Sequence, residues 1–178
     1  MNNIIQVDMN CVPFRRKRLY LIMSIPLLIL MVTIFLYLWF IYPPLSLIYV
    51  GLYLITCIFQ AYCCAYQECP YIGKFCPGIF GIIPSSRFAK LGIFQNARKS
   101  ARFFEIFGTV AFLALMAMIF LPLLWLIQLG TIITILYLGF NIIYFVIFLW
   151  NICPNCAIRS SCPAGRVSSA IRSITPIW

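Results

Sequence analysis

Residues 19–66 read LYLIMSIPLLILMVTIFLYLWFIYPPLSLIYVGLYLITCIFQAYCCAY and carry no charged side chain. A membrane-spanning helix needs about 20 apolar residues, because an α-helix rises ~1.5 Å per residue through a hydrocarbon core of ~30 Å. The stretch is roughly twice that length, so it must cross the bilayer and return. Tyr42-Pro43-Pro44 lies near its middle, where prolines end a helix and tyrosine suits the interface. We therefore expect two transmembrane helices, over residues 19–42 and 45–66.

Residues 103–152 repeat this arrangement, with Glu105 as their only charge. Gln128-Leu129-Gly130 marks a reversal and predicts helices over 103–127 and 129–151. With 64% hydrophobic and 9% charged residues, the composition excludes a soluble globular domain, which carries about a quarter charged residues. The sequence thus predicts an all-α fold, a polytopic four-helix membrane bundle that forms a single domain over residues 1–178.

The 13 Lys and Arg residues fall in three short segments, 15–18, 74–102 and 159–172, which the four helices would place at one membrane face. Basic residues are retained on the cytoplasmic side, so we expect both termini and the central loop to be cytoplasmic, in the cell (inner) membrane. From Ser86 to Arg102, basic and apolar residues alternate as in an amphipathic interfacial helix. Topology then explains the net charge of +10, and no nucleic acid partner is required. The clustered basic residues would also attract lipid headgroups.

Eight of the nine cysteines lie in or beside the basic segments. They define two cytoplasmic cysteine-rich segments, 63–102 and 151–178, and hence a cysteine-rich cytoplasmic face on the bundle. Stable disulfides are rare in a reducing compartment, where grouped cysteines more often indicate metal binding or catalysis. Burial as small residues, or acylation, would explain Cys63 and Cys64 but not the whole set.

The chain contains no histidine, which excludes mixed Cys/His zinc sites and histidine-ligated haem. Thiolate ligands leave four-cysteine zinc, an iron–sulfur cluster or a soft heavy-metal ion. Four of the cysteines precede proline, as does the cysteine that closes the bacterial ferredoxin motif. We therefore expect an iron–sulfur cluster of the 4Fe–4S type, with zinc as the alternative, and no catalytic residue. The expected ligands are Cys69, Cys76, Cys153, Cys156 and Cys162, followed by Cys63 and Cys64.

Each half of the chain is a helical hairpin followed by a cysteine–proline segment. Gly73-Lys74-Phe75-Cys76-Pro77-Gly78 and Ser161-Cys162-Pro163-Ala164-Gly165 resemble the segments that follow membrane hairpins in four-helix polyferredoxin subunits of the quinol dehydrogenase type, although the repeated C-x3-C-P pattern of that family is lacking. The resemblance implies electron transfer between quinol and redox partners. The expected partner is then a larger redox membrane complex or a cytoplasmic redox protein, and quinone is a further candidate. The chain itself would be a redox subunit of such a complex and not an enzyme by itself.

Two polar stripes inside the expected spans favour a competing interpretation. Cys57, Gln60 and Cys64 share one helix face, and Thr134, Tyr137 and Asn141 share another. The vicinal pair Cys63-Cys64, continued inward by Cys57, would suit a soft-metal uptake path and resembles the vicinal cysteines of small bacterial mercury-transport proteins. Such stripes more often serve interhelical packing. Heavy-metal transport and a zinc-stabilised structural or assembly subunit remain the alternatives to electron transfer.

Overall fold

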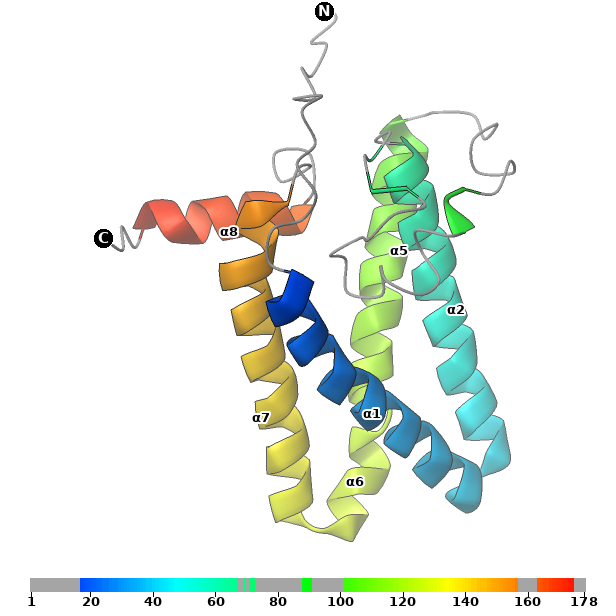
Figure 1. Cartoon of the computed structure of the whole chain (residues 1–178). Helices are drawn as coiled ribbons and strands as arrows, with labels where there is room; N and C mark the ends of the chain where they lie inside the picture. The colour runs from blue at the N-terminus through cyan, green and yellow to red at the C-terminus, as the bar shows by residue number, and fades with distance from the viewer. Residues whose placement is uncertain are drawn as a thin grey trace, which may run out of the picture.

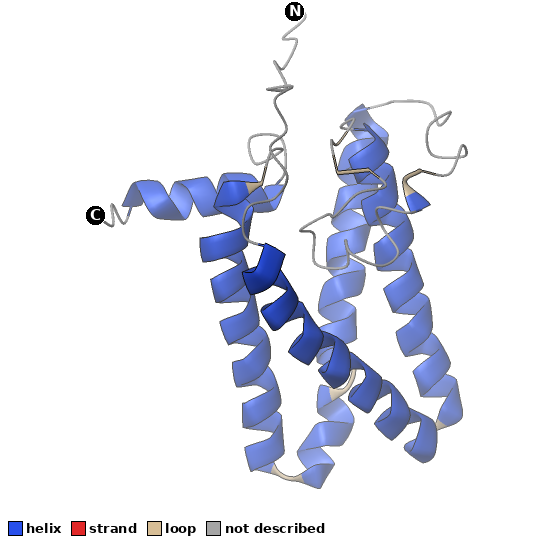
Figure 2. Ribbon diagram, in the orientation of Figure 1, coloured by secondary structure: helices blue, strands red, loops and turns tan. Residues whose placement is uncertain are grey.

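A computed structural model of the chain describes residues 17–66, 69, 71–72, 88–90, 101–156 and 163–174, and this part of the chain is helical, with no strand (Figure 2). Two short elements end the fourth span, a π-helix (η2) and a 3-10 helix (η3). The elements are α1 (Lys17–Ile41), α2 (Pro43–Tyr66), α5 (Ala101–Phe120), α6 (Leu123–Leu129), α7 (Thr131–Ile147), η2 (Phe148–Ile152), η3 (Cys153–Asn155) and α8 (Pro163–Ile174).

Within the described residues, four helical stretches are long and apolar enough to cross a membrane, which confirms the predicted four-span membrane protein. The chain passes up and down through these stretches, so that the turns at Tyr42 and Gly130 lie at one end of the bundle (Figure 1). The start of α1, the end of α2, the start of α5 and the end of α7 lie at the other end. The spans are Lys17–Ile41, Pro43–Tyr66, Arg102–Leu129 and Thr131–Asn155.

Large apolar side chains face outward along all four spans, as a lipid environment requires. Phe40 is 84% exposed and Ile132 is 75% exposed. In water such a continuous apolar surface would be an interaction site or an aggregation hazard. Here it is the surface that contacts lipid, and the chain is an integral membrane protein.

The first turn is tighter than predicted, because α2 begins at Pro43 and not at residue 45. Proline is tolerated in the first turn of a helix, where its missing N–H would have had no intrahelical partner. Tyr42 alone separates the two helices, and its backbone carbonyl accepts a hydrogen bond from the Leu45 N–H at 2.9 Å. The second turn depends on Gly130, whose φ of 131° is strained for any residue with a side chain.

The third span is not the continuous helix predicted over 103–127, because it breaks at Leu121-Pro122 between α5 and α6. Proline has no N–H to continue the helical ladder, and backbone carbonyls freed inside a membrane need other donors. The Tyr137 hydroxyl donates to the Ile119 carbonyl at 3.0 Å, and the Tyr37 hydroxyl donates to the Trp125 carbonyl at 3.3 Å. Neighbouring helices thus supply hydrogen bonds on both sides of the break.

The polar stripe of α7 packs inward, as its packing interpretation predicts. Thr134, Tyr137 and Asn141 are all buried. Asn141 donates from its side-chain amide to the Tyr137 carbonyl at 2.8 Å, one turn earlier. These groups therefore make hydrogen bonds within and between helices.

Aromatic rings join α2 to α5. Phe107 stacks on Phe59 with ring centroids 4.9 Å apart and meets the ring of Tyr62 edge-on at 4.7 Å. Tyr66 stacks on Phe104 at 4.9 Å, next to the end of α2. Because apolar burial gives little drive for association in lipid, close packing of this kind holds spans together.

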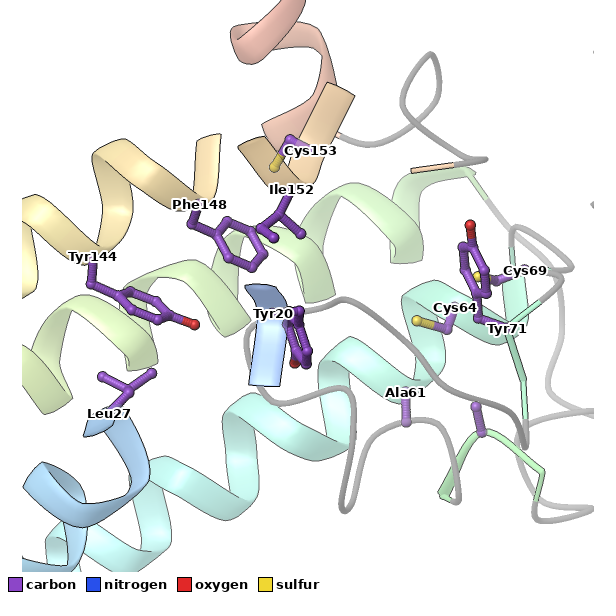
Figure 3. Packing of buried hydrophobic residues seen from close by; sticks show 11 residues of the cluster. Tyr20, Leu27, Ala61, Cys64, Cys69, Tyr71, Tyr144, Phe148, Ile152 and Cys153 are labelled. Atoms are coloured by element: carbon purple, nitrogen blue, oxygen red, sulfur yellow. The ribbon is translucent and has the colours of Figure 1, made fainter. Parts of the chain in front are cut away.

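Helix α1 reaches α7 through a cluster of buried residues near the ends of both helices (Figure 3). Tyr20 is 1% exposed and Ile152 is 1% exposed, and both belong to this cluster. The cluster also contains three of the cysteines that the sequence singled out, namely Cys64, Cys69 and Cys153.

Candidate thiol site

Six cysteines fall within the described residues, each present as a thiol, and five of these are predicted ligands. Cys63, Cys64 and Cys69 lie at the end of α2, and Cys153 and Cys156 lie after α7. Both groups of cysteines lie at the end of the bundle where α1 begins (Figure 1). Cys76 and Cys162, also predicted as ligands, lie outside the described residues, as do Cys11 and most of the predicted amphipathic helix from Ser86 to Arg102.

Cys64 and Cys69 form the first thiol pair. The chain turns back after α2, and the Cys69 N–H donates to the Cys64 carbonyl at 3.0 Å. A second turn follows, in which the Ile72 N–H donates to the Cys69 carbonyl at 3.1 Å. These two turns place the Cys69 side chain against the last turn of α2 (Figure 3). Both residues are buried there, with Cys64 9% exposed and Cys69 4% exposed.

The environment of Cys69 favours its thiolate. The hydrogen bond from the Cys64 thiol lowers the pKa of Cys69, and the backbone N–H of Tyr71 lowers it further, against the opposing effect of burial. Hydrogen bonds donated to an anion stabilise it, and here they outweigh the desolvation cost. The thiolate is the form of cysteine that binds metals, so the lowered pKa increases the fraction of Cys69 that could serve as a ligand.

Cys153 and Cys156 form the second thiol pair, on a single 3-10 turn. Pro154 stands at the start of this turn, and the Cys156 N–H donates to the Cys153 carbonyl at 3.2 Å. The side-chain amide of Asn155 closes the turn by donating to the Asn151 carbonyl at 2.8 Å. Cys153 is 6% exposed, while Cys156 is half-buried.

Cys63 faces α5 and not the first thiol pair. Its thiol donates to the Phe104 carbonyl, with sulfur and oxygen 4.0 Å apart. Cys57 is separate again, because it is fully buried and belongs to the other core cluster, with Ile34, Leu38 and Met118. The structure therefore does not join Cys57, Cys63 and Cys64 into one continuous row of thiols.

The two thiol pairs lie at the same end of the bundle. They do not together form a metal site among the described residues, where no group of three or more cysteine or acidic side chains lies close enough to hold a metal ion. Each pair by itself offers two sulfur ligands, and a structural zinc ion or an iron–sulfur cluster requires four ligands.

Sequence reasoning missed the backbone groups that surround these sulfurs, namely the Tyr71 N–H and the Phe104 carbonyl. Every residue carries such groups, so no side-chain pattern could have identified them. Comparison of the chain with protein-family models, with curated proteins and with solved structures finds no match. The thiols are therefore interpreted from their own chemistry.

Proposed function

We propose that this chain is an integral membrane electron-transfer subunit that binds an iron–sulfur cluster of the 4Fe–4S type through cysteine thiolates at one end of its helical bundle. The observation that carries the proposal is the placement of two thiol pairs, Cys64 with Cys69 and Cys153 with Cys156, at the same end of the bundle. That end also carries Lys17 and Arg18. We assign it to the cytoplasmic side of the cell (inner) membrane, with both termini cytoplasmic, because basic residues are retained there.

The chemistry of the ligands supports a cluster of iron and sulfide. The chain offers no histidine, so a metal centre at this end would be held mainly by sulfur. The lowered pKa of Cys69 favours the thiolate that such a centre requires. A buried position such as those of Cys69 and Cys153 limits the access of water, which tunes the reduction potential of a cluster.

A pair of thiols supplies only two of the four ligands of such a centre. In this proposal the two halves of the chain share one centre, with its four ligands drawn from the two thiol pairs and from Cys76 and Cys162. Both follow their pairs closely in the sequence and precede proline, as a cluster-ligating cysteine does in ferredoxins. The resemblance of these two segments to polyferredoxin subunits supports the same assignment.

A one-electron relay needs a donor and an acceptor. A larger redox membrane complex or a cytoplasmic redox protein would supply one of them at the basic face, and a quinone would be the membrane-soluble counterpart. Among the described residues, this face carries short helices and turns, so a partner subunit would also shield the cluster.

The test is anaerobic purification of the full chain in mild detergent, followed by iron, sulfide and zinc analysis and by visible absorption spectra. We expect iron and sulfide in equal amounts, with broad visible absorption that bleaches on reduction with dithionite. Cys69→Ser and Cys153→Ser should each lower the iron content, whereas the buried control Cys57→Ser should retain it. Stoichiometric zinc without colour would instead support a structural subunit. Protein without metal would contradict the proposal.

A further inference from the structure

The C-terminal helix α8 lies across the end of the bundle, at a steep angle to α7 (Figure 1). Because α7 belongs to a membrane-crossing span, a helix that crosses its end runs roughly along the membrane surface. The sequence predicted only a cysteine-rich segment here, 151–178, without an interfacial helix.

A buried hydrogen bond attaches α8 to the end of the fourth span. The Ser168 hydroxyl donates to the Leu149 carbonyl at 2.7 Å, and Ser168 is 2% exposed. In the π-helix η2 the Cys153 N–H bonds to the Phe148 carbonyl. The next donor in that pattern would be the N–H of residue 154, which is proline and has none. Ser168 thus supplies the donor that the helical ladder lacks at Leu149.

This attachment leaves the two other sides of α8 exposed. Val167 is 51% exposed, and together with Ala170 and Ile171 it falls on an apolar stripe at helical spacing. Arg166 and Ser169 are exposed on a different side. The helix sequence PAGRVSSAIRSI contains two arginines and no acidic residue. A helix with an apolar stripe, a basic polar side and low net hydrophobicity is typical of helices that lie in the membrane interface.

We propose that α8 lies in the headgroup layer of the bilayer and binds anionic phospholipid, with Arg166 at the phosphate groups and Val167 and Ala170 among the upper acyl chains. The charge selects the occupant, because a helix that carries two arginines and no acidic residue attracts anionic lipid headgroups. The attachment through Ser168 holds the apolar stripe in one orientation with respect to the spans, so lipid contact needs no rearrangement of the bundle. This inference does not depend on the thiols or on electron transfer.

The first test compares lipid retention. Full-length protein is equilibrated with mixed phosphatidylglycerol and phosphatidylcholine, transferred to detergent, and its bound lipid is measured by native mass spectrometry. Arg166→Gln should weaken phosphatidylglycerol binding about fivefold, while phosphatidylcholine binding stays the same. Arg166→Lys, which keeps the charge, and Ser169→Ala, which changes the same exposed side without altering charge, should bind as the wild type does. Unchanged phosphatidylglycerol binding in Arg166→Gln would overturn the proposal.

The second test locates the apolar stripe. A photoreactive benzoylphenylalanine at position 167, in protein reconstituted into phosphatidylglycerol nanodiscs, should cross-link to lipid, whereas the same group at position 169 should cross-link to it much less. Equal lipid cross-linking at the two positions, or none at 167, would show that α8 stands away from the bilayer. Circular dichroism of each variant checks that the helical content is retained, so that a loss of binding is not a loss of fold.

Discussion

The sulfur of Cys63 on α2 lies 3.9 Å from the position that a Cβ atom would occupy at Gly108 on α5. The same thiol donates to the Phe104 carbonyl, one turn earlier on α5. Glycine lets two membrane helices approach closely, and here the approach is close enough for a side chain on one helix to bond the backbone of the other. The α2–α5 contact, with its stacked aromatic rings, therefore fixes the spacing of the helices beside the first thiol pair.

Enlarging Gly108 should separate these helices. Gly108→Leu should destabilise the protein by about 1–3 kcal/mol, because the added atoms meet the Cys63 side chain in a packed interface. Thermal unfolding in detergent measures this effect. Gly139→Leu is the matched control, since no atom lies within 4 Å of a Cβ at that glycine, and it should change stability much less. Equal losses in the two variants would contradict close packing at Gly108.

Removing the Cys64 thiol should raise the pKa of Cys69. The hydrogen bond from Cys64 is the largest cause of the lowered value, so Cys64→Ala leaves burial less strongly opposed. In metal-free protein, iodoacetamide alkylation of Cys69, followed by mass spectrometry across a pH series, should show its midpoint shifted to higher pH. Cys57→Ala, in the other core cluster, should leave the midpoint in place. A midpoint that did not move in Cys64→Ala would exclude thiolate stabilisation by that hydrogen bond.

The lowered pKa of Cys69 also makes the stability of the protein depend on pH. A thiol whose pKa is lower in the folded protein than in the unfolded chain contributes stability above its unfolded pKa, and this contribution is lost as the pH falls through the folded pKa. The difference in stability between wild type and Cys64→Ala that arises from Cys69 ionisation should therefore be present in alkaline buffer and disappear in acidic buffer.

The Tyr137 hydroxyl should stabilise the break in the third span. Tyr137→Phe removes the donor to the Ile119 carbonyl and should cost roughly 0.6–2 kcal/mol, as measured for hydrogen bonds between membrane helices. Unfolding in mixed detergent and dodecyl sulfate measures the loss. Tyr42→Phe, at the exposed turn between α1 and α2, is the control and should be neutral. A stable Tyr137→Phe protein would mean that another donor reaches this carbonyl.

The two apolar turns should lie on the outer side of the membrane. Cysteines introduced at Tyr42 and at Gln128, both exposed at the turn end of the bundle, should react with an impermeant maleimide in intact cells. The native Cys156, half-buried at the basic end, should react only after the membrane is permeabilised. The reverse pattern would overturn the assigned topology and with it the argument that the native thiols are kept reduced.

The number of spans and the two reversals follow from the sequence alone, because charge-free stretches of this length can be satisfied only as helices inside a membrane. Both turns, at Tyr42 and at Gly130, lie where proline and glycine predicted them. The same reasoning identified the buried polar stripe on α7. These features depend on local composition and on the membrane as solvent.

The tertiary structure decided what depends on contacts between distant residues. The break at Pro122 is bridged by a hydroxyl from α7. The three cysteines of α2 lie in three different environments. Helix α8 attaches at a carbonyl that Pro154 leaves without its π-helical donor. Charge and hydropathy patterns do not predict these contacts. They indicate how each segment lies relative to the membrane, but not which other segments it touches. The pairing of Cys64 with Cys69 arose from backbone turns after α2, whose hydrogen bonds form only once the chain has folded back on the helix.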